Sequence, residues 1–151
     1  MIDEANDWMT RTIRSSEIDS AWELVKPGLD LVRARTKATW RAEHIYSELI
    51  AGRSELHLGY LKGQYIGGAV TSTWVDPFTN DKELGIWAMF SANPTTRSVG
   101  ESGRLVLQFL EGLGRSQSYR RIVFFSPREG WLRRLRNQGF AVMFYKMAKE
   151  L

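Results

Sequence analysis

Hydrophobic and polar residues follow two different periods along the chain, and together they predict a protein built from both strands and helices. Apolar and polar positions alternate over residues 55–60, and after a turn at residues 62–64 a second extended segment covers residues 65–74. A strand, a short turn and a returning strand predict a β-hairpin. Gly67 and Gly68 lie inside the returning strand, where glycines indicate a bulge or a closely approaching neighbour.

Helical spacing and further extended segments surround this hairpin. Residues 10–14 predict a first strand, and a helix follows from Ser15 or Ser16 that Pro27 and Gly28 end or kink. The later elements are a helix at 39–50, a strand at 84–92, a helix ending near Leu113, a strand at 121–125, a short helix at 130–137 stopped by Gly139, and an extended segment at 140–147. This order (strand, two helices, three strands, helix, strand, helix, strand) implies an α/β (α+β) fold with a mixed sheet and helices on both faces.

The segment from residue 93 to residue 113 joins a buried strand to an amphipathic helix through a loop that contains glycine. The first-turn N–H groups of a helix lack intrahelical acceptors, and the helix dipole adds about half a positive charge there. Arg97 adds a forked donor suited to phosphate oxygens. The segment is therefore either a cradle for an anion such as a pyrophosphate or an ordinary strand-to-helix connection. The residues concerned are Arg97, Gly100, Ser102 and Gly103 in the loop and Leu105, Val106, Phe109, Leu110 and Leu113 on the helix.

Two common phosphate-binding motifs are absent from the sequence. No Gly-x-x-x-x-Gly-Lys-Ser/Thr occurs, which argues against a P-loop NTPase. No Gly-x-Gly-x-x-Gly follows a first strand either, so a Rossmann dinucleotide site has no support.

Length and composition are those of one domain, residues 1–151, with a single core. The chain contains no cysteine, which excludes disulfides, thiol nucleophiles and cysteine-bound metals. Its two histidines, His44 and His57, do not suggest a zinc site, so no metal is expected. No apolar run approaches the length of a membrane span, and the acidic N-terminus is unlike a signal peptide. We therefore expect a cytoplasmic protein without a membrane partner.

Positive charge gathers in the last third of the chain. Residues 1–96 hold 10 Lys and Arg against 13 Asp and Glu, a net −3, whereas residues 97–151 hold 11 against 4, a net +7. Such a surface suits a polyanionic ligand or a nucleic acid, or is simply a solvated helix face. No stacking aromatic pattern accompanies the charge, so nucleic-acid binding ranks last among the functions considered. The basic residues include Arg120, Arg121, Arg128, Arg133, Arg134 and Arg136.

At this point the chain resembles the GNAT superfamily of N-acyltransferases over nearly its whole length. The element order is similar to that fold. Three motifs carry the resemblance: a loop similar to the family's acyl-coenzyme A pyrophosphate loop, a Gly-Phe after a short helix, and an Ile-Arg pair before the first helix. In this sequence they read Pro94-x-x-Arg97-x-x-Gly100-x-Ser102-x-x-Leu105, Gly139-Phe140 and Ile13-Arg14.

The resemblance implies a mostly antiparallel sheet whose fourth and fifth strands, here residues 84–92 and 121–126, splay apart. Pantetheine would lie in the gap and bond to the backbone of Met89, Phe90 and Ser91, and a backbone donor near Phe90 would stabilise the oxyanion when an amine attacks the thioester. The pyrophosphate would be held by the backbone of residues 98–103. That cofactor-binding set is Arg97, Ser98, Val99, Gly100, Glu101, Ser102 and Gly103, with Arg128 beside it.

Three positions depart from the family's pattern. Ser102 stands where the loop has glycine or alanine, and Arg128 replaces an asparagine often found after the fifth strand. Leu135 stands where a tyrosine often protonates the leaving thiolate, which leaves Tyr119 and Tyr145 as substitutes.

Glu83 is the candidate general base, because it opens the fourth strand where this family commonly positions a carboxylate. The alternative is that Glu83 is a solvated strand end. Glu55 and His57 on the hairpin are further candidates for the base.

Two functions follow from the resemblance. The first is an enzyme that transfers an acetyl group from acetyl-coenzyme A, its co-substrate, to an amine. The acceptor could be a peptide N-terminus, a lysine, a polyamine or an antibiotic. The second is a GNAT-fold binding or structural protein, such as a phage virion protein, that has lost catalysis and assembles with itself or with a protein partner.

Overall fold

The computed structural model describes residues 7–92, 99–124, 129–144 and 146–151, and at 99–102 and 129–131 it describes the backbone alone. Its centre is a five-stranded sheet whose spatial order follows the sequence order. The first four strands pair antiparallel, and the fifth pairs parallel to the fourth. The strands are β1 (Trp8–Ile13), β2 (Ser54–Leu61), β3 (Gln64–Val75), β4 (Lys82–Ser91) and β5 (Arg121–Phe124).

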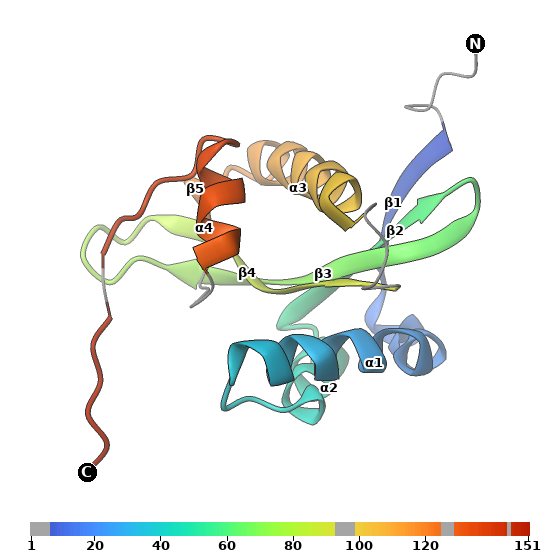
Figure 1. Ribbon diagram of the computed structural model, residues 1–151, viewed down its shortest axis with the longest axis horizontal. Coiled ribbons are helices and arrows are strands. Elements are labelled where there is room, and N and C mark those ends of the chain that lie inside the picture. The colour runs from blue at the N-terminus through green and yellow to red at the C-terminus, as the bar shows by residue number, and fades with distance from the viewer. Residues whose placement is uncertain (1–6, 93–98, 125–128, 145) are drawn as a thin grey trace.

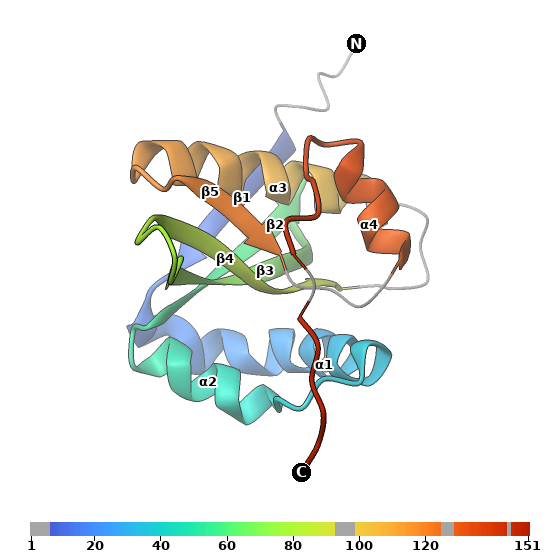
Figure 2. The ribbon, with the colours of Figure 1, turned by 90° about the vertical axis from the view of Figure 1, so that its left-hand side faces the viewer.

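Helices cover both faces of this sheet, as the sequence predicts (Figures 1 and 2). A short 3-10 turn at Ser15–Glu17 leads into α1 (Ile18–Thr36), which lies with α2 (Ala42–Ile50) on one face. The other face carries α3 (Val99–Ser116) and α4 (Glu129–Arg136). None of the described helices is long and apolar enough to span a membrane.

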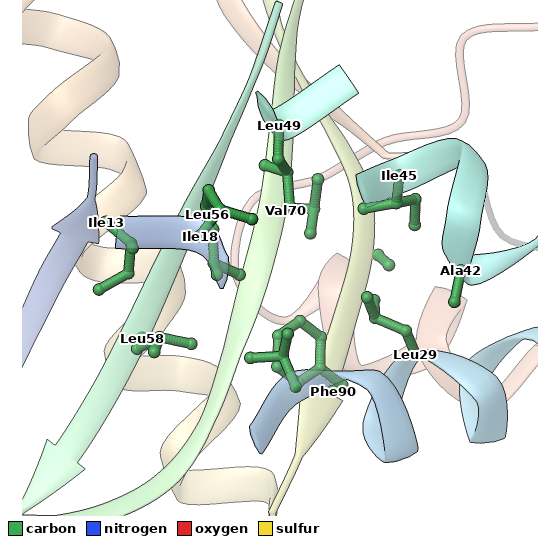
Figure 3. Close-up of a cluster of buried hydrophobic side chains, with 12 residues drawn as sticks. Ile13, Ile18, Leu29, Ala42, Ile45, Leu49, Leu56, Leu58, Val70 and Phe90 are labelled. Carbon is green, nitrogen blue, oxygen red and sulfur yellow. The ribbon is translucent and has the colours of Figure 1, made fainter. Parts of the chain in front are cut away.

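Each face of the sheet has its own hydrophobic core. The core under α1 and α2 is shown in Figure 3, where side chains from both helices meet those of β2, β3 and β4; it contains Ile18, Val25, Leu29, Ile45, Leu49, Leu56, Leu58, Val70 and Phe90. The core under α3 contains Ala69, Leu84, Ile86, Met89, Val106, Leu107, Leu110 and Leu135. Because each face of the sheet packs against a core, the central strands carry apolar side chains on both faces.

The first helix runs through Pro27 without ending, so of the two outcomes expected at this proline, an end or a kink, the end is wrong. Val25 and Leu29, on either side of Pro27, are fully buried against the sheet. Their burial continues the apolar face of α1 and offsets the hydrogen bond that proline removes, a loss of about 3 kcal/mol in a helix interior. Gly28 contributes a close contact: a Cβ at this position would lie 3.0 Å from the ring of Phe90 on β4.

The hairpin of β2 and β3 forms as predicted and turns at Lys62 and Gly63, both with positive φ. Both alternatives for the glycines of β3 hold. The register with β2 shifts beside Gly67, between Gly59 and Tyr60, which marks a bulge. A Cβ at Gly67 would lie 2.4 Å from the carbonyl oxygen of Phe90, and one at Gly68 would lie 2.3 Å from that of His57. These glycines let three strands approach closely at the centre of the sheet.

Two elements differ from those predicted from the sequence. The second helix begins at Ala42, later than expected, and leaves Trp40 in the connection before it. No strand forms after α4 among described residues 137–144 and 146–151, so the final strand of the predicted order is absent from the described chain.

Candidate functional site

The fourth strand carries a bulge halfway along its length. Its partner β3 pairs Val70 with Ala88 but Thr71 with Ile86, so Trp87 has no opposite residue on β3. An extra residue of this kind bends a strand, increases its twist and interrupts the hydrogen-bond ladder. The bulge therefore changes the direction of the second half of β4, residues 87–91.

In the described part of the chain, an outer partner strand covers only the first half of β4. Pairing of β4 with β5 covers four positions and ends at Ile86 and Phe124, whereas β4 continues to Ser91. No described strand pairs with the outer side of β4 beyond Ile86. Backbone N–H and C=O groups on such an edge can be satisfied by an extended ligand that lies beside the strand. We call residues 87–91 the open edge.

Side chains of the open edge lie on the faces of the sheet. Phe90 packs into the core under α1, beside Leu29, and its ring touches Gly28 (Figure 3). Met89 packs into the opposite core, under α3. The side chains of Phe90 and Met89 are therefore buried above and below the strand, and these two do not fill the space beside its edge.

Part of the predicted anion loop lies outside the described residues. Arg97, Ser98 and Arg128 fall in the stretches without described structure. The backbone of the remaining loop residues, from Val99 onward, is helical, because α3 begins at Val99. This helix begins on the side of the molecule where β4 ends (Figure 1). Its first-turn N–H groups, which lack intrahelical acceptors, therefore lie on the same side as the open edge.

Two tryptophans meet next to the bulge. Trp87 is the bulged residue itself, and Trp40 comes from the connection between α1 and α2. Their ring centroids lie 6.2 Å apart with planes at 81°, an edge-to-face contact, and both side chains are half-buried. No sequence pattern predicts this pair, since only the fold brings residues 40 and 87 together.

Glu83 lies at the far end of β4, six residues or roughly 20 Å from Met89. One of its carboxylate oxygens lies 3.1 Å from the guanidinium of Arg121 on β5. Arg121 also contacts Asp76 at 3.5 Å and Asp81 at 3.6 Å, so it joins β5 to the turn between β3 and β4. This ion-pair network accounts for Glu83 structurally. Its role as general base stays a prediction, and the placement does not favour it.

The turn between β3 and β4 is organised by Asp76. Its carboxylate accepts hydrogen bonds from the backbone N–H groups of Phe78 at 2.8 Å and Thr79 at 3.1 Å. These bonds, helped by the charge of Arg121, lower the pKa of Asp76 below its usual value. The turn is thus a structural feature at the end of the sheet opposite to the open edge.

Tyr119 lies at that same opposite end. Its hydroxyl is 2.6 Å from the hydroxyl of Thr73 on β3, and the ammonium of Lys82 sits 4.1 Å from the centre of its ring. These contacts place Tyr119 beside the start of β4 and away from the open edge. The other tyrosine considered as a proton donor, Tyr145, lies outside the described residues.

Leu135 is a core residue of α4, 4% exposed and packed under α3. The helix ends at Arg136, and the chain then turns at Gly139, the predicted stop, which has a φ of +89°. The Phe140 N–H donates back to the Leu135 carbonyl oxygen at 3.0 Å. An apolar side chain in this position supplies no proton.

His57 is buried between two threonines on the α3 side of the sheet. Its Nδ1 is 2.8 Å from the hydroxyl of Thr12 on β1, and its Nε2 is 2.9 Å from that of Thr71 on β3. Burial lowers the pKa of His57 to about 4. Both ring nitrogens are thus engaged within the core. Glu55, its neighbour on β2, is exposed and lies with it two strands away from β4.

No group of three or more His, Asp or Glu side chains among the described residues is placed to hold a metal ion. The features available for binding a small molecule are therefore the open edge, the start of α3 and the tryptophan pair.

Comparison with known proteins identifies the architecture. No protein-family model matches the chain, and no curated protein resembles it in sequence. Solved structures do resemble it closely. A ribosomal-protein-alanine N-acetyltransferase from Brucella melitensis biovar Abortus 2308 superimposes with a TM-score of 0.67 at 14% identity, covering 95% of this chain and 98% of that one. The chain has the GNAT fold.

Two further GNAT-fold structures extend this likeness. A predicted acetyltransferase from Clostridium acetobutylicum, solved with acetyl-CoA, has a TM-score of 0.67 at 15% identity, covering 95% of this chain and 96% of that one. An aminoglycoside acetyltransferase from an uncultured soil metagenomic sample, in complex with trehalose, has a TM-score of 0.64 at 13% identity, covering 99% and 100%. The predicted fold class is confirmed, and the likeness extends over nearly the whole chain.

Proposed function

We propose that this protein is an acyl-coenzyme A-dependent N-acyltransferase that moves an acetyl group to an amine acceptor. The observation that carries the proposal is the open edge: within a GNAT fold, β4 bulges at Trp87, and no described strand pairs with its outer side from that residue on. An extended pantetheine arm offers amide groups that can pair with the backbone of Met89 and Ser91 as an added strand would, because the carbonyl of Phe90 between them faces Gly67 on β3. The first-turn N–H groups of α3, with Arg97, suit the diphosphate of the same substrate.

The proposed reaction is a direct transfer between the two substrates. The amine nitrogen attacks the thioester carbonyl carbon, the C–N bond forms, and the C–S bond breaks to release the coenzyme A thiolate. A backbone N–H near Phe90 would stabilise the charge that develops on the carbonyl oxygen. Because Leu135 is apolar and buried, the thiolate would receive its proton from the attacking amine or from water.

Binding of acetyl-coenzyme A tests this proposal directly. We expect isothermal titration calorimetry to detect a one-to-one complex, which Arg97→Ala weakens by about 1.5–3 kcal/mol, between about tenfold and a hundredfold, because a charge-assisted phosphate contact is lost. Arg115→Ala is the matched control, since Arg115 is 80% exposed near the other end of α3 and pairs only loosely with Glu111. Absence of any binding at millimolar ligand contradicts the proposal.

The tryptophan pair is the proposed acceptor side of the site. Trp87 stands at the bulge, as the first residue of the open edge, and Trp40 reaches it from the connection between the two helices on the same face. Half-buried indole rings bind apolar groups and cationic amines. The GNAT-fold neighbours include enzymes named for ribosomal-protein alanine and for aminoglycosides, so an N-terminal alanine peptide, an aminoglycoside and spermidine are suitable acceptors to test.

Replacement of Trp87 should separate acceptor binding from donor binding. For the best of those acceptors we expect Trp87→Leu to lower kcat/KM about tenfold through a higher KM, as the loss of a cation–π contact predicts. Affinity for acetyl-coenzyme A, measured by calorimetry, should change little. Trp22→Leu is the control, because Trp22 makes a similar edge-to-face contact with Tyr46, at 5.0 Å between centroids, on helices α1 and α2. Equal effects of the two substitutions would remove Trp87 from the acceptor site.

A second function is favoured by a specific observation. Leu135 fills the core at the position where GNAT enzymes often hold a tyrosine acid, and Glu83 is engaged by Arg121. A GNAT-fold binding or structural protein without catalysis would tolerate both. A folded protein that binds no coenzyme A but forms a specific protein complex would support this function over the first.

A further inference from the structure

The connection between α1 and α2 is strongly basic. From residue 31 to residue 42 the chain has four cationic side chains and no acidic one. We call residues 33–41 the basic segment. Its four cations, all of them exposed, are Arg33, Arg35, Lys37 and Arg41. Trp40, whose ring meets that of Trp87 at the bulge of β4, belongs to the same segment, so the positive charges flank the proposed acceptor side of the site.

None of these four cations forms an ion pair with an acidic side chain of the described chain. Cations nearby, on α1 and just after α2, are compensated. The ammonium of Lys26 lies 2.7 Å from the carboxylate of Asp30, and the guanidinium of Arg53 lies 2.7 Å from that of Glu48. The basic segment therefore presents a local excess of positive charge, which attracts anionic groups.

The electrostatics of helix ends account for only two of the four cations. Arg33 and Arg35 lie in the last turn of α1, where the helix dipole favours positive charge. Arg41 is the N-cap residue of α2, where the dipole disfavours it. Lys37 has a φ of +51°, a left-handed conformation at the end of a helix that usually selects glycine or asparagine. Helix stability therefore does not explain why residues 37 and 41 are cationic.

Two contacts place the basic segment beside the open edge. A Cβ at Gly28 would lie 3.0 Å from the ring of Phe90, so this side of α1 faces β4. Arg35 follows Gly28 by seven residues, close to two helical turns, and therefore lies on the same side of the helix about 10 Å further along its axis. At the other end of the segment Trp40 reaches Trp87, with 6.2 Å between the ring centroids. The segment thus adjoins the second half of β4, where the acceptor amine would stand.

We propose that the amine acceptor carries carboxylate groups close to its amine, and that the basic segment binds them. This inference rests on the proposed transferase function and narrows its acceptor class. Arginine and lysine side chains form charge-assisted hydrogen bonds with carboxylates, while the tryptophan pair contacts the part of the acceptor that bears the amine. A peptide whose first residues are acidic has this chemistry, and so has free glutamate. The same charges would repel polycations such as spermidine and aminoglycosides.

Matched peptides test the inference. Three pentapeptides begin with alanine and differ only in having glutamate, glutamine or lysine at the second and third positions. Each is supplied with acetyl-coenzyme A and the full chain, and release of coenzyme A is followed with a thiol-reactive dye, to which a chain without cysteine contributes nothing. We expect kcat/KM for the glutamate peptide to exceed that for the glutamine peptide about tenfold, mainly through a lower KM, and the lysine peptide to be the poorest acceptor.

Two further arms use the same assay. The preference for the glutamate peptide should shrink in about 0.5 M sodium chloride, because salt screens interactions between exposed charges. A comparison of free glutamate with free glutamine shows whether the carboxylate-bearing acceptor is a peptide or a free amino acid. A preference for the acidic member of either pair supports the inference.

Paired substitutions locate the source of the preference. Arg35→Gln with Lys37→Gln should reduce the preference for the glutamate peptide to about threefold or less. Lys26→Gln with Arg53→Gln is the matched control, because it removes the same charge from cations that are already paired, and the preference should stay near tenfold. Circular dichroism confirms that both double variants are folded.

The outcomes separate this inference from the proposed function. Equal kcat/KM values within each acidic and neutral pair, a preference for the lysine peptide or spermidine, or an equal loss of preference in both double variants overturns the inference and leaves the transferase function standing. Absence of acetyl-coenzyme A binding in calorimetry contradicts the proposed function and the inference together.

Discussion

Acidification from pH 7 to pH 4 should lower the free energy of unfolding by about 3 kcal/mol through His57 alone. In the folded protein burial lowers the pKa of His57 to about 4, against a usual value of 6.5. Below pH 6.5 the unfolded chain therefore binds a proton at this residue that the folded chain does not. The stability that His57 contributes is complete above pH 6.5, falls as the pH drops, and is lost once the pH passes the folded pKa near 4.

Carboxylates also titrate in this range, so the measurement is a difference between variants. We expect urea unfolding curves for His57→Gln to show a weaker dependence of stability on pH between 6.5 and 4 than the unmodified chain. His44→Gln is the control, because His44 is exposed on α2. The prediction is contradicted if the unfolding free energy of His57→Gln depends on pH as strongly as that of the unmodified chain, while that of His44→Gln depends on pH less strongly.

Gly67→Ala should destabilise the protein by about 3–5 kcal/mol, the largest effect expected of a single methyl group in this chain. Two costs combine at this position. Gly67 has a φ of +151°, which side-chain-bearing residues rarely adopt, and the added Cβ would lie 2.4 Å from the carbonyl oxygen of Phe90. The neighbour is backbone, so it cannot move aside by changing rotamer.

Gly63→Ala separates these two costs. Gly63 also has a positive φ, +76°, but nothing lies within 4 Å of a Cβ built there. Its substitution should cost only the backbone strain, about 1–2 kcal/mol. The comparison bears on function as well, since the obstructed oxygen faces β3 and its displacement would shift Phe90 and the neighbouring residues of the open edge. Gly67→Ala should weaken acetyl-coenzyme A binding at temperatures where the variant remains folded, and Gly63→Ala should not. Equal unfolding free energies of the two variants would contradict this account.

The elements with a clear period could be predicted from the sequence. The hairpin, the apolar stripe of α3 and the stop at Gly139 each depend on local rules of alternation, helical spacing and backbone conformation. The helix does not end at Pro27, although a proline inside a helix favours an end there. Burial of Val25 and Leu29 against the sheet outweighs this local preference, and only the packed structure reveals that burial. The expected final strand is absent for a related reason. Residues 140–144 and 146–151 include apolar side chains suited to a strand, but they pair with no strand of the described chain.

The candidate site could be predicted only in part. The resemblance indicated residues 89–91, and no described strand lies beside the outer side of that stretch. The bulge at Trp87 carries no local signal, because the shift is a property of the pairing between β3 and β4. The ion pair of Glu83 could not be predicted from the sequence either. Its partner Arg121 is 38 residues away, and the two residues meet only because β5 pairs parallel to β4.

The contact between Gly28 and Phe90 constrains how this protein can vary among its relatives. A Cβ at position 28 would touch the phenyl ring at 3.0 Å, so the first helix rests directly on the strand proposed to hold the acyl donor. A larger residue at position 28 would lift the helix unless position 90 became smaller at the same time. The two positions should therefore covary, and an alignment of homologues can be read for that compensation before any variant is made.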